Sequence, residues 1–164
     1  MQSAETIRNF LEEDDWKYQV ETEDEEVVIF RTGMHIGGKI GRCDIRIICR
    51  KNQITSLANI AVYADEKHYA EAAEFITRVN YELANLCKFE MDFEDGEIRA
   101  CYEVDCDGGM QLTKEVVEGI LYFPSNMFCC YGDELLAVLF GYTTPKEAVK
   151  RLNEKQEQDE LTSE

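Results

Sequence analysis

Basic residues are scarce in this chain of 164 residues, which has 17 Lys and Arg against 34 Asp and Glu and a formal net charge of -17. Nucleic acids and anionic lipids attract basic surfaces, so they repel a chain with this charge at long range. The sequence therefore predicts no nucleic-acid partner and no membrane partner. The acidic surplus serves either solubility or the steering of a basic or partly unfolded protein partner.

Long apolar runs are also missing. The most apolar stretch, from Leu121 to Phe140, contains a proline and two charged residues, Pro124, Asp133 and Glu134, which argues against a transmembrane helix. The first residues, MQSAETIRNFLEEDDW, are amphipathic and acidic, whereas a signal peptide has a basic start and an apolar segment. We therefore expect a cytoplasmic protein, and one that folds, because 45% of its residues are hydrophobic.

Metal-binding cysteine motifs are missing as well. The seven cysteines include no C-x-x-C pair, the nearest approach being Cys101 with Cys106, and the chain has two histidines. A zinc site needs convergent pairs of ligands, and an odd number of cysteines without dense spacing does not fit a secreted disulfide scaffold. We expect buried thiols in a reducing compartment, with no metal and no cofactor.

Motifs for nucleotide binding or catalysis are incomplete. The segment GMHIGGKI matches the P-loop pattern, but Ile40 stands where a magnesium-binding hydroxyl is needed and a strand follows where a helix should, so we expect a Gly-Gly hairpin. Neither His35 nor His68 is tied by a motif to a cysteine nucleophile. The many carboxylates read as solvated charges, because spacing alone does not place two of them in a cleft. The sequence predicts no enzyme and no catalytic residue.

The chain opens with a helix and a first strand. Helical spacing of Ile7, Phe10 and Leu11 predicts a helix from Ala4 to about Asp14 with Ser3 as its N-cap. A strand with one buried face should follow, because apolar and polar residues alternate there: Trp16, Tyr18 and Val20 against Lys17, Gln19 and Glu21. The acidic run at 21–26 then forms a solvated turn.

Three more strands complete a meander. We expect a strand from Val27 to Ile36, a turn at Gly37 and Gly38 that uses a positive φ, and a return strand. The return strand buries every second residue: Cys43, Ile45, Ile47 and Cys49. A turn at 51–52 leads into a fourth strand, from Gln53 to about Tyr63.

A helix and a hairpin come next. Apolar residues recur at steps of three or four between Asp65 and Leu86, which predicts the longest helix of the protein: Ala72, Ile76, Val79, Leu83 and Leu86. The hairpin alternates apolar residues around an Asp95–Gly96 turn: Phe89, Met91 and Phe93, then Ile98, Ala100, Tyr102 and Val104. Cys101 lies on its outer face and is the thiol we expect to be most exposed.

The C-terminal part is helical. Thr113 caps a helix that Pro124 should end or kink, and Ser125 starts a new segment. The stretch 127–140 is apolar on nearly all sides, so we expect it to be deeply buried or to form a subunit interface. A capping box at 144–147 starts the last helix. Residues 1–155 form a single α+β domain, and 156–164 form a frayed polar tail.

The segment from Arg78 to Gly141 resembles the YbjN family of proposed bacterial sensory-transduction regulators, whose fold is similar to that of type III secretion chaperones. The resemblance lies in Asn80 within RVNYELANL, in the hairpin KFEMDFEDGEIRACYEV, and in 136–141 followed by the helix at Ala148. It implies an antiparallel sheet packed against helices in the order α-ββββ-α-ββ-α-α, a homodimer, a binding or regulatory role, and no catalytic chemistry.

Three functional hypotheses remain open. The first is a chaperone-like or regulatory module that holds a protein client of unknown identity on an apolar groove or sheet edge. Its candidate contact residues are Met127, Phe128, Tyr131 and Leu135. The second is a small-molecule sensor or unrecognised enzyme with a pocket between sheet and helices. The third is a structural homodimer that joins through the apolar face of the 127–140 helix.

Overall fold

The computed structural model describes residues 2–83, 86–107 and 111–162. Its elements, in chain order, are α1 (Gln2–Glu13), β1 (Gln19–Glu23), β2 (Val27–His35), β3 (Arg42–Arg50), β4 (Gln53–Asn59), the 3₁₀ helix η1 (Glu66–His68), α2 (Tyr69–Glu82), β5 (Lys88–Met91), β6 (Ile98–Asp105), α3 (Lys114–Leu139) and α4 (Pro145–Thr162). The predicted α+β fold and its order of helices and strands are confirmed. Within the described residues, no helix combines the length and apolar character that crossing a membrane requires.

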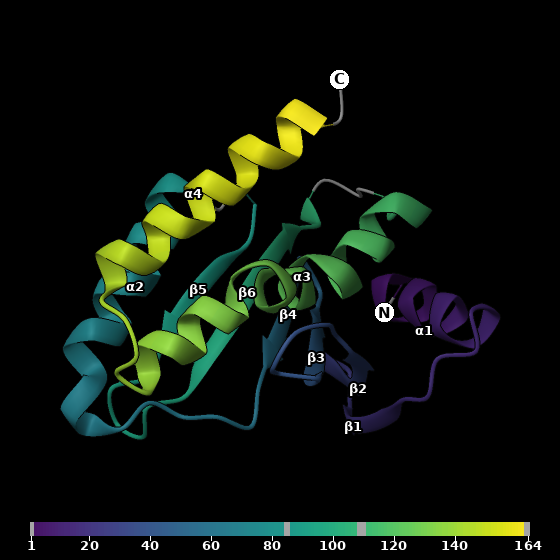
Figure 1. Cartoon of the computed structure of the whole chain (residues 1–164). Coiled ribbons are helices and arrows are strands. Elements are labelled where there is room, and N and C mark those ends of the chain that lie inside the picture. Colours follow the sequence, from purple (N-terminus) through teal and green to yellow (C-terminus); the bar gives the residue numbers. More distant parts are fainter. Residues whose placement is uncertain (1, 84–85, 108–110, 163–164) are drawn as a thin grey trace.

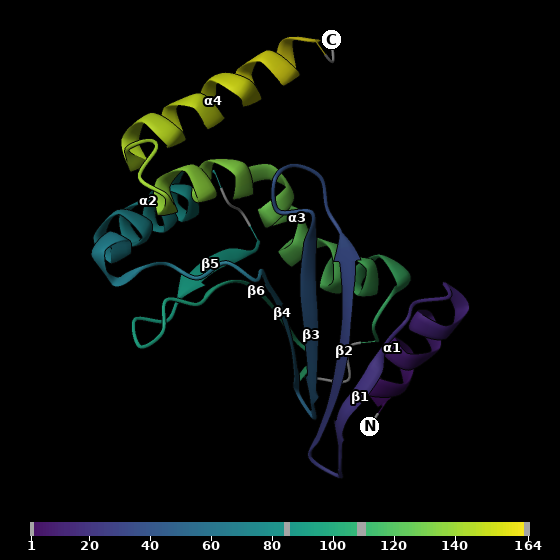
Figure 2. The same cartoon turned by 60° about the horizontal axis from the view of Figure 1, so that its bottom comes forward.

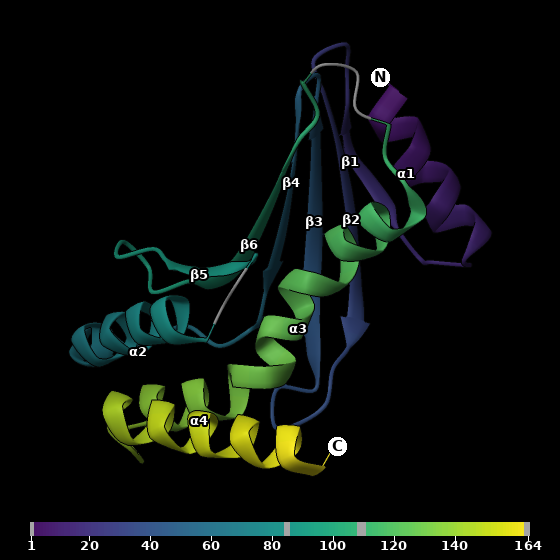
Figure 3. The same ribbon diagram turned by 90° about the horizontal axis from the view of Figure 1, so that it is seen from above.

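The six strands form one antiparallel sheet in the order β1-β2-β3-β4-β6-β5. Its inner face includes the predicted alternation in β3, where Cys43, Ile45, Ile47 and Cys49 are all buried. Helices α2 and α3 contact its strands, α4 packs against these two helices, and Figure 3 shows α3 crossing in front of the strands. We call the opposite face, formed by the outward side chains of β2, β3, β4 and β6, the open sheet face.

Helix α3 is the longest element, with 26 residues, and it packs against strands β3, β4, β5 and β6 and helices α1, α2 and α4. It begins at Thr113, whose hydroxyl accepts a hydrogen bond from the Val116 N–H, as predicted. It does not end at Pro124, so the expected new segment at Ser125 is wrong. The expected bend is visible as a change of direction along α3 in Figures 2 and 3.

The sequence around Pro124 stays helical although proline lacks the N–H that would bind the Ile120 carbonyl. The buried Ser125 hydroxyl lies 3.1 Å from the carbonyl oxygens of both Leu121 and Tyr122 and shares its proton between them, a contact that is typical of bent helices. Pro124 is itself buried against the core. Tertiary packing therefore outweighs the low helix propensity of this position.

Several element boundaries differ from the expected ones. Helix α1 already includes Ser3, which is therefore not its N-cap. Helix α2 has 14 residues, fewer than α3, and its end at Glu82 leaves Leu86 outside the helix and 67% exposed. Strand β4 ends at Asn59 instead of near Tyr63.

The first strand is shorter and more exposed than its alternation predicted. Strand β1 begins after Trp16 and Tyr18, which pack against the core, and Val20 is 37% exposed. The acidic run that we expected to be a turn lies partly within β1, which ends at Glu23, and the turn follows at 24–26. A bulge interrupts the pairing of β1 with β2.

The β5–β6 hairpin and the start of α4 are confirmed. Gly96 has the left-handed φ of 81° that the turn requires, although Phe93 lies outside β5 and is 62% exposed. At the capping box, the Thr144 N–H donates to the Glu147 carboxylate and the Glu147 N–H donates to the Thr144 hydroxyl, each at 3.3 Å. Helix α4 lies beside α2 (Figure 1) and continues to Thr162, so most of the expected polar tail is helical.

The prediction that Cys101 is the most exposed thiol is wrong. Three thiols are buried as expected: Cys43, Cys49 and Cys87. Cys101 is half-buried, whereas Cys129 and Cys130 are exposed. Helix α3 is therefore not buried on all sides, and its outer surface includes two adjacent thiols.

Candidate functional site

The four residues proposed for protein binding divide into two pairs. Phe128 and Leu135 are 1% and 0% exposed, and the Phe128 ring packs edge-on against Phe89 with centroids 5.1 Å apart. Met127 and Tyr131 are also mostly buried, but both line a groove on the helix side of the molecule. The first pair therefore belongs to the core, and the second pair marks the candidate site.

This groove, which we call the α3 groove, lies between the middle of α3 and residues near the end of α2 and the start of β5. Its lining residues are Leu83, Leu86, Cys87, Phe123, Asn126, Met127, Cys130 and Tyr131. Its volume is about 250 Å³, which is below the roughly 300–1,000 Å³ of typical small-molecule sites. Leu86 and Phe123 are its exposed apolar side chains, 67% and 39% accessible.

Aromatic contacts hold the walls of the α3 groove in place. The Tyr131 hydroxyl donates to the Leu83 carbonyl at 3.4 Å, and the Tyr131 ring packs edge-on against Phe89 with centroids 6.4 Å apart. Further along α3, the Phe123 ring packs against Tyr102 of β6 with centroids 5.2 Å apart. These contacts fix α3 relative to α2 and the sheet, so the groove is preformed.

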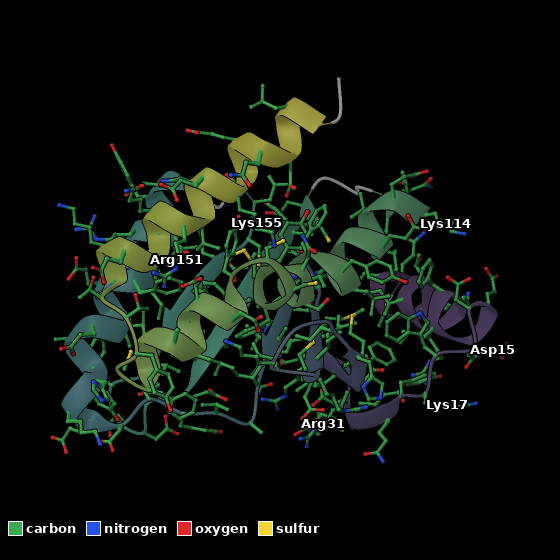
Figure 4. The ribbon with its side chains drawn as sticks, viewed as in Figure 1. Asp15, Lys17, Arg31, Lys114, Arg151 and Lys155 are labelled. Atoms are coloured by element: carbon green, nitrogen blue, oxygen red, sulfur yellow. The ribbon has the colours of Figure 1, made fainter. Side chains whose placement is uncertain are left out.

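The two thiols of the groove are poor nucleophiles. Burial raises the pKa of Cys87 to about 12, and burial also raises the pKa of Cys130. Lys155 of α4 lies beside this part of α3 (Figure 4) and opposes the shift in the Cys130 pKa without reversing it. Both groups are therefore neutral thiols at neutral pH. In the described part of the chain, no cluster of three or more His, Cys, Asp or Glu could hold a metal ion.

The free edge of β5 is occupied by a side chain of α2. The Asn80 amide donates to the Phe89 carbonyl and accepts from the Phe89 N–H, both at 2.9 Å. Asn80 thus pairs with β5 at the position where an added strand would bind. The sequence pointed to Asn80 through the family resemblance but gave it no role; its position beside the buried Val79 was the available signal.

The other edge of the sheet, β1, is obstructed in a different way. It carries a bulge and two ion-paired carboxylates: Glu21 binds Arg46 at 2.9 Å, and Glu23 binds Arg8 at 2.7 Å. Bulges and charges are the usual means by which edge strands avoid pairing with other chains. Neither edge therefore offers a regular ladder for a client strand.

The glycine-rich loop between β2 and β3 is a turn that docks onto α3. Gly38 has a φ of 74°, and the Lys39 N–H donates to the Asp133 carboxylate of α3 at 2.7 Å. In a phosphate-binding loop, such N–H groups point toward the ligand. Here a carboxylate of the chain itself occupies the anion position.

The two exposed residues of the groove were not predicted from the sequence. Leu86 continues the spacing of α2, which assigned it to a buried helix face, and Phe123 lies directly before the expected break at Pro124. No local pattern distinguishes them, because the groove joins residues about 40 positions apart in the chain.

Comparison with known proteins adds one structural likeness. No family model matches the chain, and no curated protein matches its sequence. The structure is similar to the crystal structure of YbjN from E. coli, described as a proposed transcription regulator, with 12% sequence identity and a TM-score of 0.47 over 85% of this chain and 90% of that chain. The likeness concerns the fold alone.

Proposed function

We propose that this chain is a non-enzymatic protein-binding module that receives an apolar segment of a client protein in the α3 groove. The observation that carries the proposal is the exposure of Leu86 and Phe123 beside a preformed hollow. Single exposed apolar residues are ordinary on protein surfaces. Apolar side chains gathered around a concave surface are more typical of an interaction site.

The client segment is an amphipathic helix. Strand addition is disfavoured, because Asn80 occupies the edge of β5 and a bulge with two carboxylates obstructs β1. A helix instead presents apolar side chains at spacings of three and four residues to a groove. The volume of about 250 Å³ suits one anchoring side chain better than a small-molecule ligand.

The polar face of this client helix is basic. The chain has a formal net charge of -17, and a field of this sign raises the rate at which cationic partners associate. Electrostatic attraction raises the association rate of the two proteins, while the apolar side chain bound in the groove lowers the dissociation rate of the complex. The partner is thus defined by chemistry: a helix with one apolar stripe and lysines or arginines opposite it.

A displayed library of helical peptides tests the proposal. The library is selected on the full-length protein and counter-selected on the Leu86→Glu variant. This change places a charge at the exposed groove residue without disturbing the core, because Leu86 is 67% exposed. We expect enriched peptides with apolar residues at helical spacing, which bind Leu86→Glu at least about tenfold more weakly, as burying an unpaired charge requires.

The matched control is Leu161→Glu, the same substitution at a residue of α4 that is 76% exposed and outside the groove. Fluorescence anisotropy should give equal affinities for this variant and the wild type. Peptides that bind all three proteins equally, or a library that yields no enriched sequence, would remove the groove from consideration.

A further inference from the structure

The open sheet face differs from the rest of the molecule in its charge. The outward side chains of β2, β3 and β4 include four arginines and a single acidic residue, Asp44, although the whole protein carries a net charge of -17: Arg31, Arg42, Arg46 and Arg50. On the other half of the face, the outward side chains of β6 are two acidic residues, Glu103 and Asp105, together with Cys101 and one arginine, Arg99. The face is therefore basic over β2 and β3 and acidic over β6.

Aliphatic side chains extend from the basic half to the middle of the face at β4. Ile29, Ile48 and Leu57 are half-buried on the outward side of β2, β3 and β4, away from the core packed by the helices. A hollow of about 200 Å³ opens next to Leu57 and Asn59. Arginine at the margin of an aliphatic centre is a composition that is enriched in protein interfaces.

We propose that the open sheet face joins two copies of this chain through a two-fold axis that runs along β4. Rotation about this axis places β3 of one copy over β6 of the second copy. Each residue keeps its position along the strand direction, so residues of one row face residues of the same row in the second copy. A surface that is basic on one side and acidic on the other is complementary to itself under such a rotation.

The strand register supplies the pairs. Asp44, Asn59 and Arg99 share one row across β3, β4 and β6, so Asp44 of each copy faces Arg99 of the other. Near the opposite end of the face, Gln53 of β4 lies opposite Asp105 of β6. Arg50 is the last residue of β3 and precedes Gln53 across the tight turn between β3 and β4, so it lies near the same row. The same rotation brings Arg50 of one copy toward Asp105 of the other. Leu57 lies near the axis, where it meets its equivalent.

The ion pairs that Asp44 and Arg99 make within one copy do not prevent these two residues from pairing across the interface. Arg99 binds Glu90 at 2.8 Å and Asp44 lies 3.6 Å from Arg42, and all four side chains are about half exposed. Exposed pairs of this kind contribute about 0–1 kcal/mol. Reorienting them toward a second copy therefore costs little.

The dimensions of the face suit a dimer. Strand β3 has nine residues, and at about 3.3 Å per residue and about 4.8 Å between four strands the face measures roughly 30 by 20 Å. Because side chains project from the face, its accessible area is larger than this flat area and is close to the ~800 Å² that each partner buries in a standard interface. Aligned packing of two twisted sheets is a common architecture with a separation of about 10 Å.

Sedimentation velocity of the full chain with charge-reversal variants tests this interface. At about 10 μM, above the dissociation constant expected for an interface of standard size, the wild type should sediment with twice the monomer mass of 18.9 kDa. Asp44→Arg and Arg99→Asp should each weaken the dimer at least about tenfold, because each creates two like-charge contacts across the axis. The double variant should restore the affinity to within about threefold of the wild type.

Glu71→Arg is the matched control. It changes the net charge by the same amount as Asp44→Arg, at an exposed position of α2 on the other side of the molecule. We expect it to dimerise as the wild type does, and circular dichroism should show all variants folded. A monomeric wild type, a double variant as weak as the single ones, or an equal effect of Glu71→Arg would each overturn the proposal.

Discussion

Replacing Asn80 with alanine should destabilise the protein by about 2 kcal/mol. The Asn80 amide makes two hydrogen bonds of 2.9 Å to the backbone of Phe89, a residue that is 2% exposed. Each such bond contributes about 1 kcal/mol, and more where the remaining partner stays unsatisfied. For a chain of this size, a loss of about 2 kcal/mol lowers the melting temperature by about 4–8 °C. Urea denaturation and calorimetry measure both quantities.

The aspartate variant separates these hydrogen bonds from general packing. Asn80→Asp keeps the acceptor for the Phe89 N–H, but its ionised carboxylate lacks the proton that the Phe89 carbonyl needs. The folded protein should therefore favour the protonated acid and raise its pKa above the ordinary value of about 3.9. The stability gained from this proton is fully present below the ordinary pKa and is lost as the pH rises through the raised one.

The same measurements define the result that would refute this reasoning. We expect Asn80→Asp to approach wild-type stability at about pH 4 and to fall to the level of Asn80→Ala or below at about pH 7. If Asn80→Ala costs less than about 0.5 kcal/mol, the level of an ordinary surface substitution, then Asn80 does not hold the edge of β5. An aspartate variant without pH dependence would lead to the same conclusion.

Three further predictions follow from contacts elsewhere in the chain. Phe128→Ala should cost about 3–5 kcal/mol in urea denaturation, because it leaves a cavity in the core at a side chain that is 1% exposed. Thr144→Ala should cost about 1 kcal/mol at neutral pH; the Thr144 hydrogen bonds lower the pKa of Glu147, so this cost should shrink as the pH falls through that lowered pKa. With a thiol reagent, native protein should react first at Cys129, the exposed thiol outside the α3 groove, and unfolding should release the buried thiols: Cys43, Cys49 and Cys87.

The parts of the fold that the sequence predicted are those set by neighbouring residues. The alternation around Ile45 and Ile47 identifies the buried face of β3, because successive side chains of a strand point to opposite faces. Gly96 identifies its turn through the positive φ that other residues avoid. The capping box at 144–147 is likewise complete within four residues.

The parts that the sequence did not predict depend on tertiary contacts. Helix α3 continues past Pro124 because that residue is buried against the core, and this packing outweighs its low helix propensity. The spacing of α2 extends to Leu86, but the helix ends at Glu82, and the strand β5 that Asn80 holds begins soon afterwards. The α3 groove forms where the continued helix α3 faces the residues after the early end of α2, so no single stretch of sequence predicts it.

The two proposed surfaces lie on opposite sides of the sheet, which makes their effects separable. The α3 groove is on the helix side, and Asp44 projects from β3 on the open sheet face. Perturbations at distant sites without shared partners are additive. Leu86→Glu should therefore weaken peptide binding at least about tenfold and leave the dimer intact, whereas Asp44→Arg should weaken the dimer at least about tenfold and bind the same peptide with unchanged intrinsic affinity. Anisotropy and sedimentation on the same samples measure both. A monomeric Asp44→Arg variant that also loses the peptide would show instead that the second copy completes the groove and that the two surfaces are coupled.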